Sequence, residues 1–110
     1  MKVIKKKIRK FVANKKTKTV LSDVGRVILR EKELLTIQIH NQKKNEVCAM
    51  NWGMYATSSI NRRLKKQNLL TVITKNKINK LFVMIVDKKR KKLFNNYCKK
   101  ESLKILRWIK

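Results

Sequence analysis

Residues 81–86 read Leu-Phe-Val-Met-Ile-Val and form the longest apolar run of the chain. A continuous run of this length, rich in β-branched residues, is typical of a strand that is covered on both faces. The sequence therefore predicts that residues 81–86 form the buried central strand of a sheet. A membrane-spanning helix needs about 20 apolar residues, so we expect no membrane span. A secretory signal needs an apolar segment after its basic start, and none follows here, so we expect no secretory signal.

The residues after this run predict a short helix and a last strand. Asp87 opens a run of five basic residues, Lys88–Lys92. Apolar side chains then recur with i,i+4 spacing over residues 93–98, which predicts a helix. The apolar residues of 105–109 predict the strand that closes the domain.

The residues before the run predict a longer helix. Thr57–Ser59 supplies an N-cap, and Ile60, Leu64, Leu69 and Ile73 follow at helical rather than alternating spacing. This spacing predicts a helix of about 16 residues.

Further towards the N-terminus, the sequence predicts a meander of strands. We expect short strands at residues 27–29, 34–39 and 47–50, separated by polar turns at 30–33 and 41–45. The predicted order is βββαβαβ, an α/β single domain with a mixed sheet flanked by helices.

The first 24 residues have a composition of their own. Nine basic residues lie between positions 2 and 18, and no acidic residue precedes Asp23. We expect residues 1–24 to form a basic N-terminal arm, either disordered or folded into a helix on its partner, attached to an α/β domain at residues 25–110. A targeting peptide is a weaker alternative, because such peptides are rich in Arg and Ser.

The net charge indicates the kind of partner. The 110 residues include 31 Lys or Arg against six Asp or Glu, a formal net charge of +25. With 43% apolar residues the chain has the material for a core, but such a charge repels itself unless a polyanion neutralises it. We therefore expect the protein to be fully ordered only on a nucleic acid.

Catalytic and metal-binding groups are sparse. His40 is alone, the acidic residues are scattered, and the two glycines form no phosphate-binding loop. Cys48 and Cys98 are 50 positions apart and predict reduced, buried thiols rather than a disulfide or zinc site. We expect no enzymatic activity, no cofactor and no small-molecule substrate.

Three basic clusters are the candidate RNA-binding residues, through contacts to the phosphate backbone. The third cluster is expected at a helix N-terminus, where free N–H groups would also favour phosphate. The candidates are Lys5, Lys6, Lys7, Arg9, Lys10, Lys15, Lys16 and Lys18 in the arm, Arg62, Arg63, Lys65 and Lys66 in the longer helix, and Lys88, Lys89, Arg90, Lys91 and Lys92 after the central strand.

The segment 78–85, Ile-Asn-Lys-Leu-Phe-Val-Met-Ile, resembles the central-strand motif IKNLEVMV of the small-ribosomal-subunit protein eleven family. Ser58–Ile60 and the expected helix are similar to that family's TPF-led helix, residues 25–37 to its first hairpin, and residues 41–48 to its DRQGNAL turn. Two family loops differ here, since the glycine-rich loop is shortened to residues 51–56 and the KGPGPGR loop becomes Asp-Lys-Lys-Arg-Lys. The sequence up to Lys110 contains no segment similar to the family's basic C-terminal tail.

The resemblance implies a structural protein that binds small-subunit ribosomal RNA in the platform region, beside neighbouring ribosomal proteins. The abundance of Lys, Ile and Asn reflects AT-rich codons, which are typical of organellar genomes. We therefore expect a mitochondrial, organelle-encoded ribosomal protein, or alternatively one in the cytoplasm of an AT-rich microbe. The other hypotheses are a different basic ribosomal or nucleic-acid-packaging protein, a DNA-binding protein and a cationic membrane-active protein.

Overall fold

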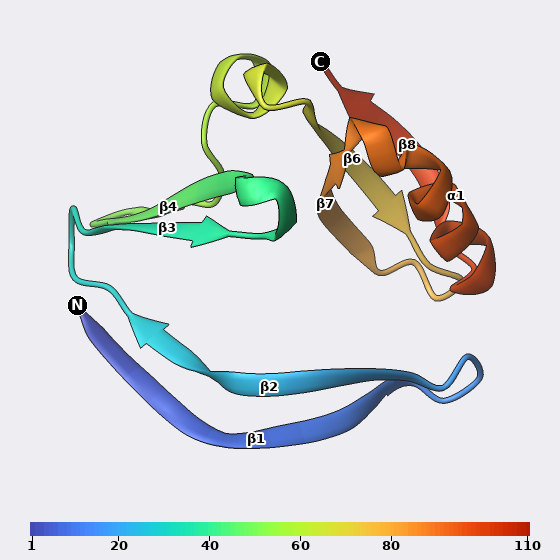
Figure 1. The fold of residues 1–110 in the computed structure, drawn as a ribbon, viewed down its shortest axis with the longest axis horizontal. Helices are drawn as coiled ribbons and strands as arrows, with labels where there is room; N and C mark the ends of the chain where they lie inside the picture. Colours follow the sequence, from blue (N-terminus) through green and yellow to red (C-terminus); the bar gives the residue numbers. More distant parts are fainter. The chain divides into compact units, whose positions relative to one another are not determined.

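The computed structural model describes the backbone of residues 1–110 and every side chain except that of Asn41. The chain forms two compact units, one of residues 1–37 and 46–56, the other of residues 38–45 and 57–110. The strands form three small antiparallel sheets (Figure 1).

The first unit begins with a long hairpin. Strand β1 (Lys2–Asn14) pairs antiparallel with β2 (Thr19–Ile28), and residues 15–18 form the turn. The register shifts between Lys5, which pairs with Gly25, and Arg9, which pairs with Asp23, so three residues of β1 face one residue of β2. Such a bulge bends a ribbon locally, and the hairpin curves in Figure 1.

Gly25 makes this irregular pairing possible. Its φ angle is +142°, a conformation that side chains oppose, and a Cβ added there would collide with the carbonyl oxygen of Ile4. The side chain of Asp23 fixes the same point, because its Oδ1 accepts a hydrogen bond from the N–H of Gly25 at 3.2 Å. A glycine is therefore required at position 25.

A second, three-stranded sheet follows the hairpin. Its order is β3-β4-β5, with β3 at Leu34–Gln38, β4 at Lys44–Met50 and β5 at Gly53–Tyr55. A 3-10 turn, η1 (His40–Gln42), connects β3 and β4. The expected strands at 34–39 and 47–50 and the turn between them are confirmed, with shifted ends.

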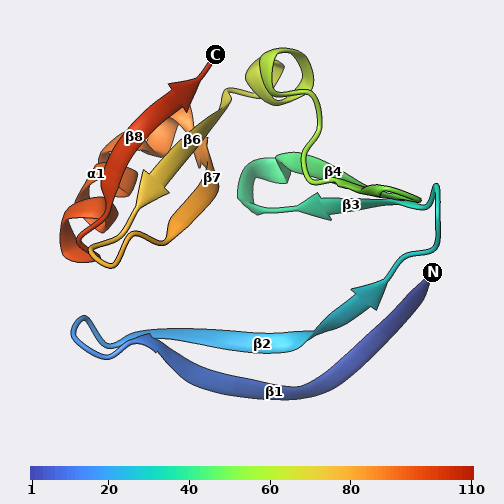
Figure 2. The same cartoon turned by 180° about the vertical axis from the view of Figure 1, so that it is seen from behind.

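The second unit contains the best-buried sheet, of order β7-β6-β8. Its strands are β6 (Leu69–Lys75), β7 (Leu81–Asp87) and β8 (Lys104–Ile109). Helix α1 (Lys91–Lys100) lies along this sheet in Figures 1 and 2, and its Phe94 ring meets the Trp108 ring edge-on at 5.9 Å between centroids. Two short helical turns, η2 (Ile60–Leu64) and η3 (Lys88–Arg90), precede β6 and α1.

The predicted fold class is wrong. The structure is mostly β, its paired strands are antiparallel, and α1 is its one regular α-helix, so it is not a mixed sheet flanked by helices. The residues of the predicted basic N-terminal arm, 1–24, form β1, the hairpin turn and the first part of β2 rather than a helix or a disordered segment. The proposed boundary between residues 24 and 25 falls inside β2, and the division of function between an arm and a domain stays a prediction.

The long helix predicted from Ile60 is also wrong beyond its first turn. Ser59 is the N-cap as expected, since its Oγ accepts a hydrogen bond from the N–H of Arg63 at 2.9 Å. However, Asn68 has a φ angle of +60°, which ends the helical segment, and residues 69–75 form β6. The β-branched residues of Thr-Val-Ile-Thr favour the extended backbone there.

Residues 81–86 do form a strand, but it is not the central one. β7 is an edge strand, and Val83 is 63% exposed, whereas the central strand β6 buries Val72 and Thr74 completely. Both faces of β6 are covered, because Leu69 and Thr71 on the opposite face are also buried. The helix predicted over 93–98 and the strand predicted over 105–109 are confirmed.

The described residues form no helix long and apolar enough to cross a membrane.

Both cysteines were predicted to be buried. Cys98 is buried, whereas Cys48 is only half-buried, so the prediction is correct for Cys98 alone. Burial raises the pKa of the Cys98 thiol above its ordinary value, which keeps it protonated.

Candidate nucleic-acid interface

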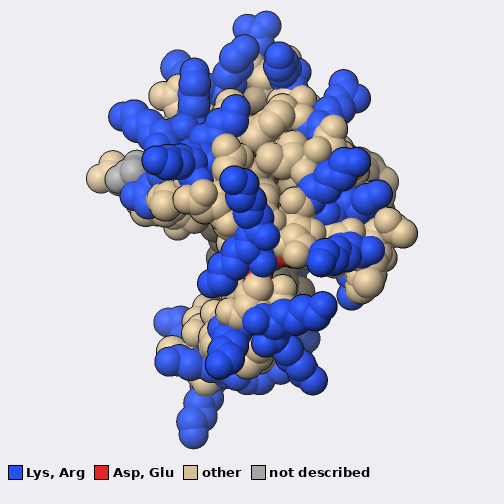
Figure 3. All heavy atoms as spheres, turned by 90° about the vertical axis from the view of Figure 1, so that its right-hand side faces the viewer, with Lys and Arg blue, Asp and Glu red and all other residues tan. Residues whose placement is uncertain are grey.

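All 17 predicted RNA-binding side chains are exposed. Eight lie on the β1–β2 hairpin, four on η2 and the residues that follow it, and five on η3 and the start of α1. Figure 3 shows Lys and Arg over the face seen in that view, with hardly any acidic side chain among them. The positions are therefore suited to contact a polyanion.

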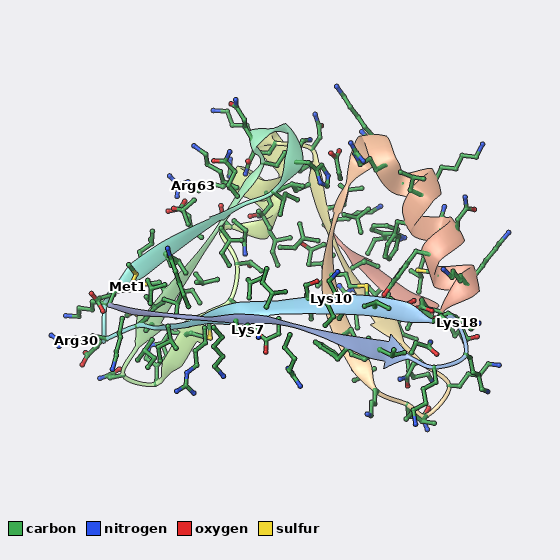
Figure 4. All side chains as sticks on the ribbon, turned by 60° about the horizontal axis from the view of Figure 1, so that its bottom comes forward. Met1, Lys7, Lys10, Lys18, Arg30 and Arg63 are labelled. Atoms are coloured by element: carbon green, nitrogen blue, oxygen red, sulfur yellow. The ribbon has the colours of Figure 1, made fainter. Side chains whose placement is uncertain are left out.

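The hairpin carries the densest charge of the first unit. Residues 2–28 contain ten Lys or Arg and a single acid, Asp23. Strand β1 has 13 residues, which at about 3.3 Å per residue extend over about 40 Å. Figure 4 shows Lys7, Lys10 and Lys18 distributed along this ribbon, with Lys18 at the end opposite Met1. The hairpin is thus a long cationic ribbon.

The acid of the hairpin is neutralised locally. Asp23 Oδ2 lies 3.4 Å from the guanidinium of Arg9, its partner in the register. The hydrogen bond from the N–H of Gly25, together with Arg9 and Lys6, holds the pKa of Asp23 below its ordinary value. Asp23 therefore stays ionised at neutral pH and paired with Arg9, and no other acid of the hairpin repels a phosphate.

Each face of the hairpin mixes charged and apolar side chains. Lys2 and Ile4 share one face, whereas Val3 and Lys5 share the other, and the same mixture continues beyond the bulge. The apolar side chains are largely exposed, for example Val12 at 52% and Leu21 at 49%. A two-stranded hairpin without a covered face is marginally stable in water, which favours a role completed by a partner.

Arg26 is a cation of the hairpin that the sequence analysis missed. It lies on β2, exposed and directly opposite Ile4, and its neighbour Gly25 faces Lys5. Because the hairpin itself was not predicted, nothing in the sequence connected residue 26 with the basic residues of β1. The signal available in retrospect is the β-branched content of residues 19–28, since five of these ten residues are Val, Ile or Thr.

The predicted phosphate site at Lys88–Lys92 is altered by the structure. The N–H of Lys88 donates to the carbonyl of Asn68 at 2.9 Å, and the N–H of Lys89 donates to Oδ1 of Asp87 at 3.1 Å. These two backbone donors are therefore occupied within the protein. The cluster offers charged side chains to a ligand, but not the free N–H groups expected at its start.

Asp87 holds this region together. Its side chain is 3% exposed, and Oδ1 lies 3.3 Å from Nζ of Lys43, whose side chain is 12% exposed. Burial alone raises the pKa of Asp87, but the N–H of Lys89 and the charges of Lys43 and Arg90 outweigh burial and hold the pKa below its ordinary value. The ionised carboxylate thus joins the turn before β4 to the end of β7.

We predict that this ion pair makes the second unit sensitive to acid. Because the pKa of Asp87 is lowered in the folded state, its stabilisation is complete above the unfolded value of about 3.9 and disappears as the pH falls through the folded value. Asp87→Asn should lower the urea midpoint at pH 7, since Lys43 then loses its counter-charge. The urea midpoint of this variant should also fall less steeply than that of the wild type as the pH drops below 4.

The matched control is Glu31→Gln, which removes one carboxylate at an exposed position. Urea titrations from pH 7 to pH 2, followed by circular dichroism, measure both variants. Equal midpoints for Asp87→Asn and Glu31→Gln would contradict a stabilising role for the Lys43–Asp87 pair.

Two of the predicted clusters meet in the second unit. Lys65, which follows η2, and Lys91, the first residue of α1, line the same pocket. The sequence places these lysines 26 positions apart, so only the tertiary structure brings them together. Among the described side chains, no three His, Cys, Asp or Glu are grouped so that they could hold a metal ion.

Comparison of the chain with protein-family models, with curated protein sequences and with solved structures finds no match.

Proposed function

We propose that this protein binds RNA through the phosphate backbone, as a structural component of a ribonucleoprotein. The observation that carries the proposal is the β1–β2 hairpin, a ribbon of ten cations whose one acid is paired with Arg9. Phosphates supply the countercharge that this ribbon lacks.

The proposal extends to the small subunit of an organellar, mitochondrial ribosome, where the protein would contact ribosomal RNA and neighbouring ribosomal proteins. This finer part rests on the sequence resemblance to the protein eleven family and on the abundance of Lys, Ile and Asn, residues that AT-rich codons encode. The α/β fold that the resemblance implied is not part of the proposal. The charge of the hairpin supports RNA binding in general, and sequencing of the co-purified RNA tests the ribosomal part of the proposal.

The hairpin argues against a membrane-active peptide. Binding to a bilayer surface requires the apolar residues to gather on one face and the charges on the other. In the register of the hairpin, each face carries both kinds of residue, such as Lys10 beside Val12 and Arg9 beside Phe11. A phosphate backbone tolerates this mixture, because long basic side chains can reach it from either face.

The test is sedimentation of the native complex, with sequencing of the RNA that co-purifies. We expect the wild-type protein to sediment with small-subunit ribosomal RNA. Replacing Lys5, Lys6 and Lys7 by Gln should reduce RNA affinity on the order of 100-fold, because each lost phosphate contact costs about fivefold at physiological salt.

The control replaces Lys99, Lys100 and Lys104 by Gln, an equal loss of charge at exposed positions outside the predicted clusters. It should sediment like the wild type. If the hairpin variant also does so, the hairpin is not the interface. If the RNA recovered is not ribosomal, RNA binding stands and the ribosomal assignment is wrong.

A further inference from the structure

The second unit has a pocket of about 390 Å³ at one end of its sheet. Residues Thr71–Lys75 of β6 pair with β8. The first two residues of β6, Leu69 and Leu70, extend past the end of β8 and line the pocket. Ile60 of η2, Lys65 directly after η2 and Lys91 of α1 also line the pocket. The volume lies within the range of about 300–1,000 Å³ that is usual for small-molecule sites.

The lining combines an apolar interior with positive charge. Four aliphatic residues and Trp108 line the pocket, and its charged lining residues are Lys65, Lys91 and Lys110. Among the described residues, no acid lines the pocket. A ligand that fits has a flat apolar part and a negative charge beside it.

Trp108 is held in place on the wall. Its ring packs edge-on against Phe94, and Nζ of Lys91 lies 4.6 Å from the ring centroid. This cation–π contact keeps the ammonium group of Lys91 next to the aromatic surface. An aromatic wall and a fixed cation are therefore present together before any ligand binds.

We infer that the pocket receives one unpaired nucleotide of the bound RNA, with the base among the apolar side chains and the adjoining phosphates at the three lysines. The inference rests on the proposed function and adds a specific recognition element to it. RNA proteins commonly recognise bases that are splayed out of a helix, through contacts to apolar and aromatic side chains. An unpaired nucleotide also matches the charge, because its phosphates bring the anions that the lysines lack.

The experiment compares two RNA stem-loops, one fully paired and the other identical apart from one bulged adenosine. In a Trp52→Phe background, Trp108 is the only tryptophan, and its fluorescence reports on the pocket. We expect the bulged RNA to bind about tenfold more tightly and to quench Trp108, since stacking on one base is worth about this much.

Two charge-reversal variants of equal net charge test whether the preference for the bulged RNA depends on the pocket. Lys65→Glu changes a lining residue, whereas Lys66→Glu changes the next residue, which is also exposed but does not line the pocket. Both should weaken binding of the paired RNA equally. Only Lys65→Glu should abolish the preference for the bulged RNA.

The outcomes separate the two proposals. Equal affinity for both RNAs, without quenching, overturns the pocket inference and leaves RNA binding intact. No binding of either RNA overturns the proposed function and the inference with it. Quenching by phosphatidylglycerol vesicles, but not by the bulged RNA, overturns the inference by assigning the pocket to an anionic lipid.

Discussion

Raising the salt concentration from 50 to 200 mM is expected to weaken RNA binding by about 10³- to 10⁵-fold, if the protein neutralises about six to ten phosphates. The physical reason is the release of counterions from the RNA when Lys and Arg replace them. The hairpin alone carries ten basic residues, so it has enough charge to neutralise most of these phosphates. Single base changes in paired regions should alter the affinity little, because backbone contacts do not read sequence.

Fluorescence anisotropy of a labelled RNA, titrated at several salt concentrations, measures the slope of log K against log salt. Replacing Lys5, Lys6 and Lys7 by Gln should reduce this slope by about 3, one unit for each phosphate contact. The Lys99, Lys100 and Lys104 variant should keep the wild-type slope. A slope of about 2 or less for the wild type would mean that the basic residues are solvated surface and not an interface.

Sequence alone indicated several elements correctly because their signals are local. Ser59 as an N-cap, the helix around residues 93–98, and the strands at 81–86 and 105–109 depend on short-range spacing and capping. The exposure of the 17 basic candidates also follows from the cost of burying a charge. These features need no knowledge of the partner element in space.

The hairpin was missed because its turn lacks the usual signals. Turns with a positive φ normally use Gly or Asn, but the turn of this hairpin has Lys18 at a φ angle of +57°. Its loop, Lys-Lys-Thr-Lys, looks like a continuation of the basic arm. The loop contains no Gly, Pro, Asn or Asp, so nothing in its composition separates it from the basic residues that precede it.

Features of the site that depend on tertiary contacts could not be predicted. The N–H groups of Lys88 and Lys89 are occupied by Asn68 and Asp87, and this depends on how the segment before β6 meets the end of β7. The meeting of Lys65 and Lys91 at one pocket has the same origin. Charge clusters were visible in the sequence, but their accessible donors and their grouping were not.

The order of strands in the second unit also depends on tertiary contacts, and the sequence placed the wrong strand at the centre of the sheet. An apolar run suggests a buried strand, but β7 leaves Val83 63% exposed, whereas the more polar Leu-Leu-Thr-Val-Ile-Thr-Lys of β6 lies between two neighbours. The two threonines of β6 are buried because both faces of this central strand are covered, and Thr74 Oγ1 lies 3.8 Å from the sulfur of Met84. Position in the sheet, more than hydrophobicity, decides burial here.

We therefore expect Val72→Asp to unfold the second unit and Val83→Asp to leave it folded. Val72 is 0% exposed, and a carboxylate there has no partner, at a cost of several kcal/mol against a total stability of about 5–15 kcal/mol. Val83 faces solvent on an edge strand, where a substitution changes stability by about 0.5 kcal/mol or less. Circular dichroism and urea unfolding at high salt, where self-repulsion is screened, compare the two variants directly. The opposite result, an intolerant Val83 and a tolerant Val72, would place β7 at the centre of the sheet and contradict the strand order β7-β6-β8.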